Sequence, residues 1–126
     1  MKKILIIATI ILSFGITNAQ NATNLIGKSF EQIDNIPNST TTLFFKSNTI
    51  VIYVITNIIN GKTIIDECPG KCTIIGNKIS IKCSCSDKEI YPDPITDNFI
   101  YDTKYQTLTS SSYRSRDGKF LLWKLI

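Results

Sequence analysis

The chain has 126 residues, and its 14 Lys and Arg against 10 Asp and Glu give a formal net charge of +4. Two of the lysines, Lys2 and Lys3, lie in a predicted leader, so removing them lowers the charge from +4 to +2, too little for a typical nucleic-acid-binding domain. The absence of histidine excludes Ser-His and Cys-His catalysis. We therefore expect a non-enzymatic protein with no nucleic-acid partner and no cofactor.

The first 19 residues have the three parts of a secretory signal peptide. Lys2 and Lys3 precede an apolar run over residues 4–16, and Thr17 and Ala19 are the small residues expected before a cleavage site. The apolar run is shorter than the roughly 20 residues of a transmembrane helix. The prediction is a secreted or periplasmic monomer, cleaved after Ala19, with residues 20–126 forming one domain and no membrane span after cleavage.

Beyond the leader, the chain is expected to consist mainly of β-strands. Residues 24–33 could hold a short helix through Leu25, Ile26, Phe30 and Ile33. The β-like runs that follow are 41–46, 49–59, 62–68, 71–75, 78–85, 99–102, 105–112 and 120–125.

Turn signals separate these runs, and the clearest are Asn60-Gly61, Pro69-Gly70, Gly76-Asn77 and Asp117-Gly118. Sequential hairpins at this spacing are typical of an all-β domain. The predicted fold is a single antiparallel up-and-down meander of about 7–8 strands, closed like a barrel or folded as a sandwich.

The run 50–55 is apolar on both of its faces. A strand with one solvated face should alternate apolar and polar residues. The second face is therefore expected either to be covered by the N-terminal segment or to meet a ligand or a partner. The candidate residues for such a contact are Ile50, Ile52 and Val54.

All four cysteines of the chain lie within residues 68–85, whose sequence is CPGKCTIIGNKISIKCSC. Strand alternation places Cys83 and Cys85 on the same face as Ile79 and Ile81, which predicts that these sulfurs face the core. They are two residues apart on one strand, too far to bond easily to each other.

A hairpin at Gly76-Asn77 brings Cys72 opposite Ile81 or, with a slightly longer loop, opposite Cys83. The same turn brings Cys68 towards Cys85. Two nested disulfides are predicted on this basis, Cys72–Cys83 and Cys68–Cys85. A crossed pairing and a Cys68–Cys72 link remain open.

Four thiolates could instead bind zinc or copper(I), or exchange disulfides with a substrate. The spacing C-x3-C followed by C-x-C departs from the C-x2-C pairs of zinc sites. The loop C-P-G-K-C is one residue longer than a redox C-x-x-C loop, and an exported chain meets oxidising conditions. A thiolate metal-binding protein is retained as an alternative function, and no metal site is predicted.

Acid–base catalysis needs a pair of carboxyl groups. Asp66 and Glu67 are adjacent in a predicted strand and point to opposite faces. Asp93 and Asp97 flank Pro94 and are expected to serve turns. No catalytic residue is predicted.

Three stretches resemble small secreted lipocalin-like domains of bacteria: TLFFKSN at 42–48, CTIIGNKISI at 72–81 and DGKFLLWKL at 117–125. The Gly-x-Trp found near the start of lipocalins is replaced here by Gly27-Lys28-Ser29. The resemblance implies a binding or structural β-domain. The predicted function is binding of a small apolar ligand or a protein partner, and the alternative is a secreted inhibitor or cell-envelope interaction protein.

Overall fold

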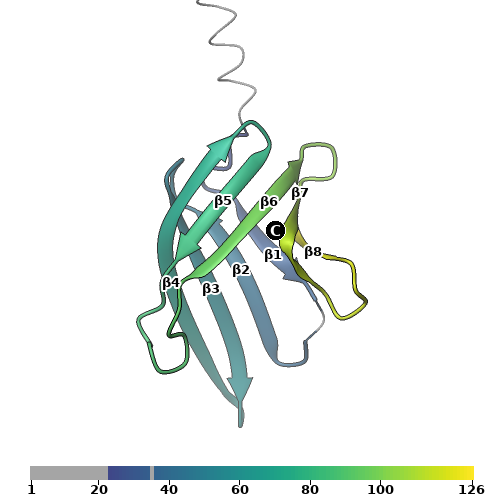
Figure 1. Ribbon diagram of the computed structural model, residues 1–126. Helices are drawn as coiled ribbons and strands as arrows, with labels where there is room; N and C mark the ends of the chain where they lie inside the picture. The colour runs from purple at the N-terminus through teal and green to yellow at the C-terminus, as the bar shows by residue number, and fades with distance from the viewer. Residues whose placement is uncertain (1–22, 35) are drawn as a thin grey trace, which may run out of the picture.

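The computed structural model describes residues 23–34 and 36–126, so the predicted signal peptide lies outside the described residues. Eight antiparallel strands follow one another around a closed barrel (Figure 1). The first strand pairs with the last, with Phe30 opposite Leu125, and this pairing closes the sheet. The predicted up-and-down meander is confirmed, as a barrel and not as a sandwich. Its strands are β1 (Ser29–Ile33), β2 (Ser39–Phe45), β3 (Ile50–Ile59), β4 (Lys62–Ile75), β5 (Lys78–Cys83), β6 (Ile95–Asp102), β7 (Thr107–Arg114) and β8 (Phe120–Leu125).

The β3–β4 hairpin is the longest pair of strands and reaches beyond the rest of the barrel, at the bottom of Figure 1. Asn60 and Gly61 both have positive φ, 53° and 75°, as a two-residue type I′ turn requires. β5 pairs with β4 only from Gly70 onward, so residues 62–68 of β4 are matched to β3 alone in the described part of the chain.

A turn or bulge was predicted at Pro69-Gly70, and this prediction is wrong, because β4 continues through both residues. The carbonyl oxygen of Pro69 accepts a hydrogen bond from Ser84 N–H on the side away from β3. The N–H and C=O of a strand residue point to the same side, so the nitrogen of Pro69 removes no donor from the β3–β4 ladder. Gly70 fits where β4 passes close to Cys83 of β5.

The short helix predicted within residues 24–33 is also absent. Residues 29–33 form β1, which pairs with β2 on one side and with β8 on the other and so closes the barrel. The weak helical pattern is overridden by these two sets of strand hydrogen bonds. Residues ahead of β1 cross one end of the barrel, where Leu25 is fully buried and Gly27 N–H donates to the carbonyl of Phe45.

The interior is packed at the end that Leu25 covers. Phe30 meets the rings of Phe45 and Tyr101 edge to face, with centroids 5.9 and 6.1 Å away. Further along the barrel, towards its other end, Trp123 makes the same kind of contact with Tyr53 and Phe99 at 5.8 and 5.9 Å. Such edge-to-face pairs stabilise a core beyond simple area burial. The opposite end of the barrel is not filled in this way.

Candidate functional site

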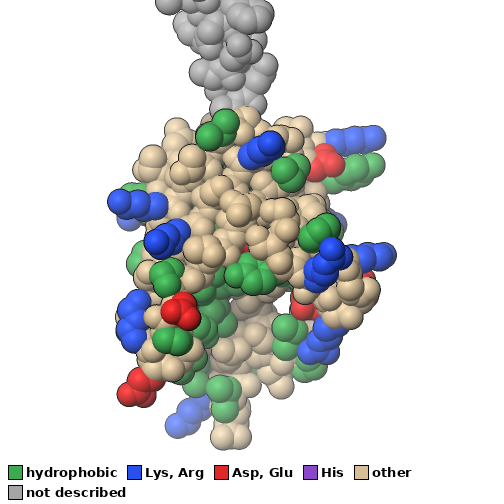
Figure 2. All heavy atoms as spheres, viewed as in Figure 1, with side chains coloured by type: hydrophobic (Ala, Val, Ile, Leu, Met, Phe, Trp, Pro, Cys, Tyr) green, Lys and Arg blue, Asp and Glu red, His purple; other side chains and the backbone are tan. Residues whose placement is uncertain are grey.

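A hollow of about 320 Å³ opens at the end of the barrel opposite Leu25. Figure 2 shows the surface depressed in the lower half of the view, between the β3–β4 and β7–β8 hairpins, with hydrophobic side chains around the depression. Aromatic and apolar residues form much of its wall: Tyr53, Ile95, Tyr113, Leu121 and Trp123. Four polar or charged residues share it: Gln32, Asp34, Asp97 and Arg114.

A second hollow, of about 420 Å³, lies between the β1–β2 turn and β3. Residues such as Ile36, Asn38 and Ile58 line it, and every lining residue is exposed or only half-buried. It therefore lacks the buried, fixed polar groups that orient a ligand. The interior hollow has such groups and is the candidate site.

Asp97 is the buried charged residue of the interior hollow, with 5% of its surface exposed. Its Oδ1 accepts hydrogen bonds from Ser110 Oγ and from Asn98 N–H, both at 2.7 Å. Burial raises the pKa of Asp97 above that of an ordinary carboxyl group, and the two hydrogen bonds oppose the rise in part. The prediction that Asp97 serves a turn is wrong, because the residue lies in β6 and faces the interior.

Ser110 holds Asp97 and also shapes the mouth of the hollow. Its hydroxyl group donates to Asp97 and accepts from the N–H groups of Ser112 and Tyr113, at 3.2 and 2.9 Å. These bonds accompany an irregular register between β7 and β8 after Thr109. A bulge of this kind re-aims the side chains that follow it, here Tyr113 at the mouth.

Trp123 is the only tryptophan of the chain and is 1% exposed. Its indole Nε1–H is buried without a hydrogen-bond partner among the described residues. Tyr53 packs against the same ring, and burial, with a smaller contribution from the Asp97 carboxylate, raises the pKa of Tyr53 far above its usual range. Tyr53 therefore stays a neutral phenol at any physiological pH.

Arg114 is the only cationic residue in the lining of this hollow. Its guanidinium group donates to the carbonyl of Gly118 at 2.8 Å and lies 4.2 Å from the ring centroid of Phe120. It is thus held by the β7–β8 hairpin. Asp97 forms no ion pair within the described part of the chain, and no cation contributes to its pKa.

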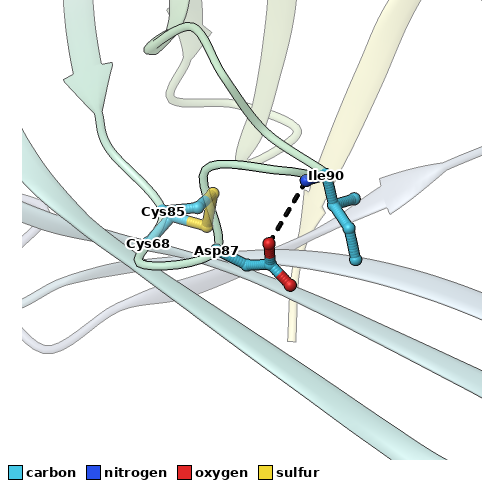
Figure 3. The surroundings of a disulfide bond; sticks show 4 residues. All are labelled: Cys68, Cys85, Asp87 and Ile90. Carbon is cyan, nitrogen blue, oxygen red and sulfur yellow. Dashed lines mark hydrogen bonds between the residues drawn. A yellow bond between two sulfur atoms is a disulfide. The ribbon is translucent and has the colours of Figure 1, made fainter.

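The structure contains a disulfide between Cys68 and Cys85, one of the two predicted, with Cα atoms 4.1 Å apart. Figure 3 shows the bond beside the β5–β6 loop, where Asp87 Oδ1 accepts from Ile90 N–H at 3.2 Å. Cys68 pairs with Tyr53 across the β3–β4 ladder. The disulfide therefore joins this loop to the strand next to the wall of the hollow.

The predicted Cys72–Cys83 disulfide is not formed in the structure, where both residues are free, buried cysteines. The turn at Gly76-Asn77 pairs Ile75 with Lys78, and the same register places Cys72 opposite Ile81 and Cys83 opposite Gly70. One register cannot match both predicted pairs, because they differ by two residues along β4. Cys72 Sγ instead donates to the carbonyl of Asn48 at 3.4 Å.

The two remaining thiols should be countable by alkylation. Burial raises the pKa of Cys83 to about 11 and raises that of Cys72, so both stay protonated and unreactive at neutral pH in the folded protein. Iodoacetamide should modify two cysteines after unfolding without reductant, and all four after reduction. Peptide mapping should locate the first two labels on Cys72 and Cys83. Unfolded, unreduced protein with no label would show that a second disulfide exists.

The predicted contact residues of β3 point away from the hollow. Ile50 is 43% exposed, and Ile52 and Val54 are half-buried on the outer surface of the barrel. Ile52 pairs with Phe44 in β2 and with Pro69 in β4, so the face has apolar neighbours on both sides of this residue. A partner at this face stays a prediction.

Comparisons with protein-family models, curated proteins and solved structures return no match to this chain. Within residues 23–34 and 36–126, no helix is long and apolar enough to cross a membrane. The same residues include no cluster of three or more His, Cys, Asp or Glu side chains placed to hold a metal ion. The candidate site therefore rests on its own geometry.

Sequence reasoning missed the residues that line the hollow. A usable signal is present in β6, ITDNFIYD, where alternation puts Asp97 on the same face as Ile95, Phe99 and Tyr101. A carboxyl group on an otherwise apolar strand face is unusual enough to mark a site. The approach of Trp123 and Tyr53 to Asp97 carries no such signal, because it depends on how the barrel closes.

Proposed function

We propose that this chain is an exported, non-enzymatic binding protein that holds one small molecule in the open end of its barrel. The observation that carries the proposal is the presence of two residues with buried polar groups in the lining of one hollow. The carboxyl group of Asp97 and the indole N–H of Trp123 both belong to residues of its lining. A mostly apolar wall with a few fixed polar groups is the usual composition of a small-molecule site.

Two further observations support export and a lipocalin-like role. Disulfides persist in oxidising compartments, and Cys68–Cys85 agrees with the predicted signal peptide. An eight-stranded up-and-down barrel is also the architecture in which lipocalins enclose a single small ligand. The predicted ligand was apolar, but the lining favours a ligand with an apolar body and at least one polar group.

The proposal can be tested through the single indole resonance of ¹⁵N-labelled protein. Trp123 is the only tryptophan and lines the hollow, so the single Nε1–H signal comes from a residue of the candidate site. Titration with benzyl alcohol, a small ring with a hydroxyl group, should shift this resonance saturably. The ring of the probe would lie among the aromatic side chains of the lining, next to Trp123, and would change the environment of the indole group.

Two variants of neighbouring β1 residues make the test specific. Gln32→Phe places a ring in the hollow and should abolish the shift. Glu31→Phe adds the same ring on the opposite face of the strand and should leave it intact. Equal shifts in both variants would mean that the alcohol binds elsewhere, and the proposal would then fail.

A further inference from the structure

Acidic residues outnumber basic ones in the lining of the hollow, whereas basic residues outnumber acidic ones in the chain as a whole. The full sequence carries +4, yet the charged residues of the lining are Asp34 and Asp97 against Arg114 alone. Arg114 is held by the Gly118 carbonyl and the Phe120 ring. Asp97 is therefore a buried carboxyl group without a cationic partner among the described residues.

Leaving such a carboxylate unpaired destabilises the folded protein, because removal from water is not repaid by an opposite charge. The hydrogen bonds that Asp97 makes with the protein use Oδ1 only. An asparagine could accept the same two bonds from Ser110 and Asn98 without a charge. The negative charge of Asp97 is thus unnecessary for holding the bulge in β7. The second carboxylate oxygen of Asp97, Oδ2, is available to a ligand.

The rings around Asp97 suit the same kind of ligand. Tyr53, Tyr113 and Trp123 line the hollow with it, and aromatic faces attract cations. The hollow is near the lower limit of typical ligand pockets, so the ligand must be small.

We propose that the hollow is selective for a small organic cation, a protonated amine that pairs with Asp97 while its apolar body lies among Tyr53, Tyr113 and Trp123. This inference rests on the proposed function and specifies its ligand class. The carboxylate fixes the position of the ammonium group, and the rings exclude water from the pair.

Three probes that share one ring and differ in charge test the selectivity: benzylamine, benzyl alcohol and benzoate. Each is titrated while the Trp123 indole resonance is followed. Benzylamine should bind at least about tenfold more tightly than benzyl alcohol, because a charge-assisted hydrogen bond to a desolvated carboxylate is stronger than a neutral one. Benzoate should bind most weakly, because Asp97 repels it.

Asp97→Asn should lower the benzylamine affinity about tenfold or more and change that of benzyl alcohol by less than about twofold. Asp87→Asn removes the same charge from the β5–β6 loop, outside the hollow, and should leave both affinities unchanged. Equal affinities of the wild-type protein for benzylamine and benzyl alcohol would overturn the amine inference and leave the binding proposal standing. Tightest binding of benzoate would also overturn it, in favour of Arg114. No shift with any probe would overturn both.

Thermal stability gives a second readout that separates a ligand-binding carboxyl group from a structural one. Since the pKa of Asp97 is raised in the folded state, its ionisation opposes folding, and stability falls as the pH rises through that pKa. Asp97→Asn should therefore raise the melting temperature at neutral pH, with the gain disappearing in acid. A lower melting temperature at neutral pH would show that the charge is structural. The other titratable groups around Asp97 are Asp34, Tyr53, Cys83, Tyr113 and Arg114.

Discussion

Gly70→Ala is expected to destabilise the protein by about 4 kcal/mol or more, which is exceptional for one added methyl group. A Cβ on Gly70 would overlap the carbonyl oxygen of Lys82 and lie 2.5 Å from the Cα of Cys83. Both neighbours are backbone atoms of β5, so no side-chain rotation can relieve the overlap. The β4–β5 pairing would have to open next to the Cys68–Cys85 disulfide.

Denaturant unfolding of Gly70→Ala measures this effect, and Gly61→Ala is the matched control. A Cβ on Gly61 meets no atom within 4 Å, but its φ of 75° disfavours alanine. The control should therefore show a conformational cost of only about 1 kcal/mol. A domain of this size is stabilised by about 5–15 kcal/mol in total, so the two variants should be easy to tell apart. Similar losses in both would contradict the close β4–β5 approach.

Removal of the Cys68–Cys85 disulfide is expected to lower the free energy of unfolding by about 3 kcal/mol. The bond joins residues 17 apart in sequence, so it restricts the unfolded chain. It also holds the start of the β5–β6 loop against β4 next to the hollow. The double variant Cys68→Ala/Cys85→Ala should show the loss, and a reductant should produce a comparable loss in the wild type.

The free cysteines provide the control for the disulfide. Cys72→Ala/Cys83→Ala also deletes two buried sulfurs but leaves the cross-link intact. Its stability should still fall when a reductant is added, whereas that of Cys68→Ala/Cys85→Ala should not change. A variant lacking Cys68 and Cys85 that still responds to reductant would place the stabilising bond between Cys72 and Cys83.

Local patterns predicted most of the fold. In β5, alternate residues are buried, so the parity that assigned Ile79, Ile81 and Cys83 to the core is confirmed. The Asn60-Gly61 and Gly76-Asn77 turns lie where predicted, because two-residue hairpins depend mainly on their own backbone torsions. The sequence already favours one of the possible disulfides. A two-residue turn at Gly76-Asn77 fixes the strand register, and that register places Cys68 opposite Cys85.

The wrong predictions concern segments whose structure depends on strands that are distant in the sequence. β1 is a strand because β2 and β8 flank it, and the sequence of residues 29–33 alone does not predict that pairing. Pro94 suggested a turn around Asp97, yet β6 begins at Ile95, which pairs with Cys83 of β5. The candidate site brings together Tyr53, Asp97 and Trp123 from three strands, so it exists only once the barrel has closed.

The overhang of the β3–β4 hairpin has a consequence for self-association. A closed barrel leaves few backbone edges open, but residues 62–68 of β4 have a strand partner on one side only in the described part of the chain. Unpaired N–H and C=O groups along such an edge can template an additional strand from another molecule. Ile64 and Ile65, 44% and 58% exposed, would favour such an addition. The charged side chains of Lys62, Asp66 and Glu67 on the same segment oppose such an addition, because a strand laid along the edge would take them partly out of water.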